Sequence, residues 1–157
     1  MKTALQWLEE GSFAIAIRQS VWMYPALEIV HITGIVLLVG PALIFDLRLL
    51  VVAGNLPVPI VAKDLLSWSR KGLILVVPSG LLLFITNAAT LAYDPVFLTK
   101  LILLVVAGLN ALTFHRYILP QFSSTVVPSV NKRAKITALI SILAWLAIIT
   151  CGRLLAY

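Results

Sequence analysis

A glutamate and a histidine lie one helical turn apart inside an apolar stretch that is long enough to cross a bilayer. Glu28 and His31 fall within residues 25–45, and the other histidine of the chain, His115, also lies in an apolar run. An ionisable side chain is costly in hydrocarbon, so its presence there is by default a sign of function. The two histidines are therefore the first candidates for chemistry.

Each histidine has small residues nearby at helical spacing. Gly34 follows His31 by three positions, and Gly108 and Ala111 precede His115 by seven and four. A neutral imidazole nitrogen can ligate the iron of a b-type haem, and missing side chains leave room for the macrocycle. In this interpretation the second ring nitrogen needs an acceptor, such as a carbonyl, a carboxylate or a water. Both histidines are thus predicted haem ligands, with His31 the better candidate.

Two charged neighbours fit the same interpretation. Arg116 adjoins His115, and a guanidinium pairs through two hydrogen bonds with a haem propionate or a lipid phosphate. Glu28 is expected at the outer interface, where it is solvated or assists His31. Glu28-x-x-His31 also has the spacing of a di-iron bundle motif, but that motif needs a second helix with further glutamates, which this chain does not supply.

Other roles for the histidines stay open. Each could hydrogen-bond a neighbouring helix, as polar residues do in membrane bundles, or could serve proton or solute transport. The expected depths also differ, since His31 lies about 9 Å and His115 about 22 Å from the outer side. Either the span boundaries are off by several residues or the histidines do not share one haem. In the second case each haem would take its other ligand from another protomer of a symmetric oligomer.

The composition requires a membrane around these residues. The 157-residue chain is 61% hydrophobic and 11% charged, which is more apolar than a small soluble domain can bury. Its net charge of +6 comes from basic residues beside apolar runs, where the positive-inside rule explains them without nucleic acid. The single cysteine, Cys151, excludes an intramolecular disulfide and is interpreted as a small hydrophobe in a span.

The elements that position the histidines are predicted to be helices. Four apolar runs match the roughly 20 residues needed to cross the hydrocarbon core, and an amphipathic helix over 3–18 is expected to lie in the interface before them. The predicted fold is an all-α integral membrane protein, a four-helix transmembrane bundle forming one domain over 1–157. The expected spans are 25–45, 72–92, 97–119 and 136–155.

Local signals set the ends of these spans. Asp46 and Arg48 are expected to form an interfacial turn after the first span, in contact with headgroups. The triplet Pro78-Ser79-Gly80 predicts a kink in the second span. Asp94 before Pro95 predicts the start of a helix, and Asn131 is expected to cap the fourth span.

The distribution of basic residues predicts the orientation. Eight of them flank the loops after the first and third spans, against four on the opposite side. Those two loops are therefore expected in the cytoplasm and both termini in the periplasm. The eight are Arg48, Lys63, Arg70, Lys71, Arg116, Lys132, Arg133 and Lys135, and the four are Lys2, Arg18, Lys100 and Arg153.

Several motifs resemble those of a family of small bacterial four-span membrane proteins of unknown function, and the resemblance covers most of the chain. More loosely, His31 followed by glycine, with Lys100 opening the third span, is similar to copper resistance protein D-like proteins and to small b-type cytochromes. Those cytochromes carry several histidines in their spans, so a two-haem pattern does not transfer to a chain with two. The motifs are Trp7-Leu8-Glu9-Glu10, Tyr24 to His31, Phe45 to Leu50, and Asn110 to Arg116.

The sequence thus predicts a b-type haem-binding protein of the bacterial inner membrane that carries electrons across it, rather than a stand-alone enzyme. It is expected to form a homo-oligomer through small-residue faces and to have a quinone or a periplasmic protein as redox partner. The alternative is a non-redox membrane component, either a structural subunit or a transporter of a small solute, metal or protons.

Overall fold

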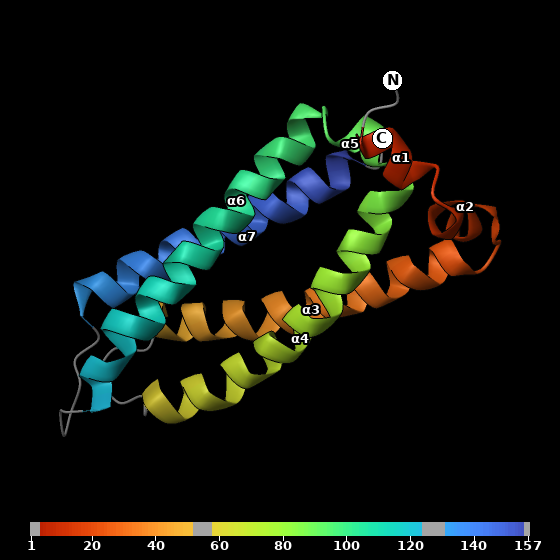
Figure 1. Ribbon diagram of the computed structural model, residues 1–157. Helices are drawn as coiled ribbons and strands as arrows, with labels where there is room; N and C mark the ends of the chain where they lie inside the picture. Colours follow the sequence, from red (N-terminus) through yellow and green to blue (C-terminus); the bar gives the residue numbers. More distant parts are fainter. Residues whose placement is uncertain (1–3, 52–57, 124–130, 156–157) are drawn as a thin grey trace.

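The computed structural model describes residues 4–51, 58–123 and 131–155, and every regular element in these ranges is helical (Figure 1). Four helices are long and apolar enough to span a membrane, which confirms the expected all-α fold. The elements in chain order are α1 (Ala4–Glu9), α2 (Ser12–Gln19), α3 (Met23–Val51), α4 (Val58–Thr86), α5 (Ala88–Leu91), α6 (Pro95–Thr113), η1 (Phe114–Ile118), η2 (Leu119–Ser123) and α7 (Lys132–Leu154).

The long helices form two pairs. Helix α3 packs along α4, α6 packs along α7, and a contact between α3 and α7 joins the pairs. The short α5 connects α4 to α6, where the rings of Phe84 and Phe97 stack with their centroids 5.4 Å apart. Helix α1 packs against α5, at the opposite end of the molecule from the last residues of α3 and of η2 (Figure 1).

Helix α4 starts earlier and ends earlier than the expected second span over 72–92. It is helical from Val58, because residues 62, 65, 66 and 69 are at least partly buried on one face while charged side chains are exposed on the other. It ends at Thr86, since Asn87 has φ −139° and ψ 38°, outside the helical region. The amphipathic first half of α4 therefore belongs to a spanning helix, although the predicted second span begins only at residue 72.

The amphipathic helix expected over 3–18 is two helices, α1 and α2, and Thr3 lies outside the described residues. The break falls at Gly11, whose φ of −60° and ψ of 142° are extended. Helix α2 buries Ala14 and Ile17, whereas Trp7 and Trp22 are 73% and 80% exposed. Exposed indole rings at this end of the spans fit the headgroup level of a bilayer.

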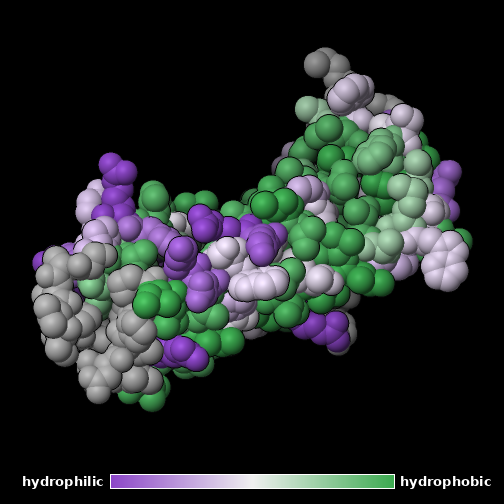
Figure 2. Space-filling model, turned by 90° about the horizontal axis from the view of Figure 1, so that it is seen from below, coloured by the Kyte–Doolittle hydropathy of each residue, from purple (hydrophilic) through white to green (hydrophobic). Residues whose placement is uncertain are grey.

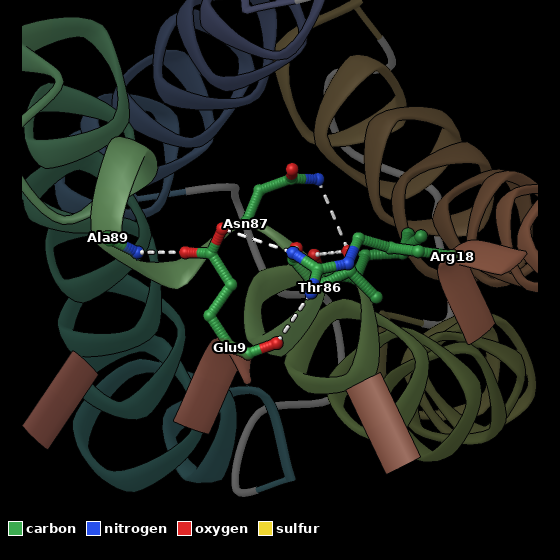
Figure 3. Close-up of polar contacts among 6 residues, drawn as sticks. Glu9, Arg18, Thr86, Asn87 and Ala89 are labelled. Atoms are coloured by element: carbon green, nitrogen blue, oxygen red, sulfur yellow. Dashed lines mark hydrogen bonds and ion pairs between the residues drawn. The ribbon is translucent and has the colours of Figure 1, made fainter. Parts of the chain in front are cut away.

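A network around Arg18 holds α1 and α2 against the corner between α4 and α5 (Figure 3). The Arg18 guanidinium donates to the Glu9 carboxylate and to the Thr86 carbonyl, each at 3.1 Å. The other Glu9 carboxylate oxygen accepts from the Ala89 amide at 2.9 Å. The Asn87 amide nitrogen lies 3.3 Å from the Thr86 hydroxyl. Arg18 and Glu9 form an ion pair with each other, and their hydrogen bonds to the Thr86 carbonyl and from the Ala89 amide link the N-terminal helices to a turn about 70 residues later in the chain.

Both expected helix caps are confirmed. The Asp94 carboxylate accepts hydrogen bonds from the amides of Val96 and Phe97, at 2.7 and 3.0 Å. The Asn131 side chain accepts from the Arg133 amide at 3.2 Å. Each cap satisfies amides that have no partner within the helix, so α6 and α7 begin where the sequence predicts.

The buried apolar core lies toward the end of the molecule where α3 and η2 end and where α4 and α7 begin. There, aromatic and aliphatic side chains of α3, η1 and η2 meet alanines of α4 and α7. Much of the remaining surface is apolar, and only 6% of the apolar window of α6 is buried. Figure 2 shows broad hydrophobic surface toward the end that carries α1 and α2, and hydrophilic groups toward the other. Lipid is therefore the solvent for α6 and for much of the exterior.

Helices α3 and α4 approach each other backbone to backbone. A Cβ atom on Gly72 would clash with the Leu38 amide and lie 2.7 Å from the Gly34 carbonyl, and a Cβ on Gly34 would lie 2.8–3.0 Å from atoms of Val76 and Leu75. The Ser69 hydroxyl donates to the Leu38 carbonyl at 2.8 Å. Small residues allow this packing in a bilayer, where dispersion and polar contacts replace the hydrophobic drive.

We expect Gly72→Ala to destabilise the protein in detergent by about 1–3 kcal/mol, because the new methyl group meets backbone that cannot move aside. Thermal unfolding followed by tryptophan fluorescence measures the effect. Gly40→Ala, on α3, is the matched control, because a Cβ there has no atom within 4 Å. Equal melting temperatures for the two variants would contradict the close approach.

Candidate functional site

His31 faces α4 and is held by a hydrogen bond. Its Nδ1 lies 2.9 Å from the hydroxyl oxygen of Ser79, a residue that is 3% exposed. The Ser79 hydroxyl donates to the Leu75 carbonyl at 2.5 Å. Since a serine has one hydroxyl hydrogen, its oxygen then accepts from His31 Nδ1–H. This network assigns the neutral ring a proton on Nδ1 and a lone pair on Nε2.

The two glycines near His31 have different roles. A Cβ on Gly80 would lie 2.9 Å from His31 Cε1, so the missing side chain of Gly80 makes room for the imidazole. Gly34 is buried against Val76 and Leu75. Of the two uses that the sequence allows for Gly34, a flat ligand or another helix, the structure shows the helix.

Lys100 and Cys151 bring α6 and α7 to the same site. The Lys100 ammonium nitrogen lies 3.7 Å from the place that a Cβ on Gly152 would take. Its charge interacts with His31 and with Cys151. We call His31, Ser79, Lys100 and Cys151 the histidine cluster. It joins one residue from each of the four spanning helices.

His115 lies near the opposite end of the bundle. It is 20 residues past the start of α6, whereas His31 is eight past the start of α3, so their depths differ by about 18 Å at 1.5 Å per residue. The structure does not bring the two histidines together within one chain. Of the two explanations left open by the sequence, it favours histidines that do not share a haem.

The residues around His115 are exposed. Gly108 and Ala111 are exposed, and nothing lies within 4 Å of a Cβ on Gly108. Arg116 is exposed as well. The imidazole of His115 lines an open pocket together with two basic side chains of α4, Lys63 and Arg70.

Glu28 and the predicted metal motif give no site in the described residues. Glu28 is exposed, and its charge interacts with Tyr24, one turn before it. Across residues 4–51, 58–123 and 131–155, no three histidine, cysteine, aspartate or glutamate side chains could hold a metal ion together. The di-iron interpretation of Glu28 and His31 therefore has no support within one chain.

Asp46 corrects one expectation. It was expected in an interfacial turn, but α3 continues to Val51 and Asp46 is only 7% exposed. One carboxylate oxygen takes part in a hydrogen bond with Ser141 of α7. Its Oδ2 has no hydrogen-bond partner in the described part of the chain. The expectation was wrong because Asp46 lies between Phe45 and Leu49 on the core face of the helix.

Sequence reasoning missed three members of the histidine cluster as site residues. Ser79 was interpreted through its neighbours as part of a kink, Lys100 as a residue near the start of a span, and Cys151 as a packing residue. The signal that could have found Lys100 is the one that found His31, an ionisable side chain in a span. Ser79 and Cys151 carry no such signal, because both are common in transmembrane helices.

Residues 6–157 match the family described as a family of unknown function, DUF6644. The chain belongs to the DUF6644 family. No curated protein and no solved structure matches it. DUF6644 membership agrees with the expected family of unknown function and covers nearly the whole chain, but it shows no link to copper resistance protein D-like proteins or cytochromes. Because the DUF6644 family has no known function, the function of this protein has to be inferred from the histidine cluster and the other residues of the structure.

We expect Ser79→Ala to shift the tautomer ratio of His31 away from Nδ1–H by about fivefold, the equivalent of a net hydrogen bond of ~1 kcal/mol. Nitrogen NMR of imidazole-labelled protein in micelles reports the ratio directly. Ser67→Ala, on the same helix, is the matched control and should leave the ratio unchanged. An unchanged ratio in Ser79→Ala would contradict the assignment of Nε2 as the free nitrogen.

We expect Asp46→Asn to stabilise the protein by about 1 kcal/mol, because the amide keeps a hydrogen bond to Ser141 and no charge is left buried with one unpaired oxygen. Thermal unfolding in detergent measures the change. Asp64→Asn, at an exposed carboxylate of α4, is the control and should have little effect. A clear loss of stability in Asp46→Asn would instead show that the charge itself is needed.

Proposed function

We propose that this protein is a b-type haem-binding membrane protein for transmembrane electron transfer, in which Nε2 of His31 would hold the haem iron. The observation that carries the proposal is the bond from His31 Nδ1 to Ser79. Metal-ligating histidines donate their other ring nitrogen to an acceptor, which fixes the tautomer and raises the basicity of the ligating nitrogen. Ser79 supplies this acceptor and is itself held by Leu75.

The surroundings of His31 supply the other groups that a haem requires. Gly80 and Gly152 lack side chains beside His31 and Lys100. A flat macrocycle needs such small residues along its edge. Lys100 places an ammonium group within electrostatic range of His31, where it would pair with a propionate carboxylate. Bound haem supplies reversible one-electron chemistry, and the chain supplies the ligand, the counter-charge and the apolar shell.

A second ligand to the iron would come from another protomer, because His115 lies about 18 Å away in depth. A homo-oligomer is therefore part of the proposal, and the exposed small-residue face of α6 at Gly108 and Ala111 is where we place the contact. His115 would hold a second haem only beside a further ligand from another protomer. A quinone or a periplasmic protein would exchange electrons with the His31 end.

The proposed location is the bacterial inner membrane, with both termini in the periplasm. The first half of α4 supports this orientation, because its exposed charged residues lie toward the connection that precedes it, which the positive-inside rule places in the cytoplasm. The histidine cluster would then lie in the periplasmic half of the bilayer. This is the half in which a periplasmic redox partner could reach it.

Asp46 favours a second candidate, a non-redox role in proton or solute transport. A membrane-embedded carboxyl group with one unpaired oxygen is a feature of proton relays. Asn110 of α6 lies near the same layer, since its side chain donates to the Thr137 carbonyl at 2.9 Å, one helical turn before Ser141. This polar layer is separate from the histidine cluster, so the two candidates predict different sensitive residues.

The absorption spectrum tests the proposal. Protein purified from cells supplied with a haem precursor should show a Soret band and, after dithionite, α and β bands. His31→Ala should lose these bands. Ser79→Ala should bind haem about tenfold more weakly, as loss of a supporting hydrogen bond does at metal sites. His115→Ala should keep the spectrum that depends on His31.

Thr33→Val is the matched control for these variants. Thr33 is exposed two positions from His31, and its hydroxyl donates within its own helix to the Ile29 carbonyl. It should keep both the spectrum and the elution volume on size exclusion. A colourless wild-type protein, or a spectrum retained in His31→Ala, would refute the haem proposal and favour the transport candidate.

A further inference from the structure

The pocket beside His115 is built by elements far apart in the sequence. Its volume is about 410 Å³, and it lies between the first half of α4 and the turns η1 and η2. In η1 the Leu119 amide donates to the Phe114 carbonyl, five residues back, so the helix widens just before Pro120. His115 is carried by this widened turn. The lining residues are Ala62, Lys63, Leu66, Arg70, His115, Leu119 and Pro120.

The polar side of the pocket is lined by cationic side chains. Lys63 and Arg70 lie two helical turns apart on one face of α4, and the charge of Arg70 interacts with His115. In the described part of the chain no carboxylate lies within ion-pair distance of Lys63 or Arg70. Two permanent cations beside an imidazole repel each other, and an anion bound between them would offset this repulsion.

The other side of the pocket is apolar. Ala62, Leu66, Leu119 and Pro120 contribute to its wall. His115 follows the last residue of α6 by two positions, and Leu112, about one helical turn before His115, is 60% exposed. Figure 2 shows hydrophilic groups gathered in this half of the molecule, next to hydrophobic surface. The ligand that fits both sides is an anion attached to a hydrocarbon chain.

We propose that the pocket formed by Lys63, Arg70 and His115 binds the phosphate of an anionic phospholipid headgroup, with the acyl chains along α6. A guanidinium donates two parallel hydrogen bonds to phosphate oxygens, and an ammonium adds a point charge. Basic pockets at the cytoplasmic ends of transmembrane helices bind anionic headgroups in this way. The assignment uses neither His31 nor any other member of the histidine cluster, so it does not depend on a haem at His31.

Native mass spectrometry of the full chain in neutral detergent tests the assignment. The probes are phosphatidylglycerol and phosphatidylcholine of equal chain length, with inorganic phosphate as competitor. Wild-type protein should retain phosphatidylglycerol in preference to phosphatidylcholine. Lys63→Gln and Arg70→Gln should each raise the dissociation constant for phosphatidylglycerol about tenfold, the loss expected for one charge-assisted hydrogen bond.

Lys71→Gln is the matched control for charge. Lys71 is exposed on the same helix next to Arg70, and its ammonium lies 4.2 Å from the centroid of the Trp68 ring rather than in the pocket lining. This variant should bind phosphatidylglycerol as wild type does. An equal loss in Lys71→Gln would mean general surface attraction and would overturn the proposal.

Two further outcomes would overturn the assignment. Release of the lipid by millimolar inorganic phosphate would show that the site takes free phosphate rather than a headgroup. Loss of the haem spectrum in His115→Ala would assign His115 to iron and not to the phosphate pocket. Native electrophoretic mobility and the melting temperature of each variant show whether it is folded. If Arg70→Gln does not fold, Lys63→Gln carries the test.

Discussion

The structure depends on the backbone contact between α3 and α4 at Gly34 and Gly72. No side chain separates the helices there, so their relative height and rotation are fixed to within the size of a methyl group. This contact determines which residue of α4 faces His31, since Ser79 and Gly80 follow Gly72 by about two helical turns. A site built on a single imidazole needs such rigidity, because an imidazole that is not held by its neighbours populates several rotamers and both tautomers.

From this fixed pair the molecule divides into two ends with different chemistry. One end joins all four spanning helices through His31, Ser79, Lys100 and Cys151, and its groups are polar or charged. The other end is held by aromatic and aliphatic packing around Phe45 and Phe114, whose rings meet edge to face at 5.4 Å. Apolar packing holds the second end together, whereas at the histidine cluster the hydrogen bond between His31 and Ser79 joins α3 to α4.

The sequence predicts what is local and cannot predict which faces meet. Asp94 and Asn131 cap helices because a short side chain reaches amides two or three residues away, whereas the break at Gly11 divides a segment that was expected to be one helix. Gly34 shows the limit of prediction from sequence. A missing side chain leaves room for a flat ligand or for another helix, and the sequence does not show which of the two lies there. Asp46 shows the same limit. Hydropathy predicts that a carboxylate lies at the interface, but Asp46 is buried because Phe45 and Leu49, on the same face of α3, pack into the core.

The network around Arg18 has a consequence for how the chain is made. Glu9 bonds to an amide 80 residues later, so α1 and α2 leave the ribosome well before the turn that anchors them exists. Until α4 and α5 are in place, the charges of Glu9 and Arg18 have only each other and water. Docking of α1 and α2 therefore cannot be complete until the end of α4 and the start of α5 have formed.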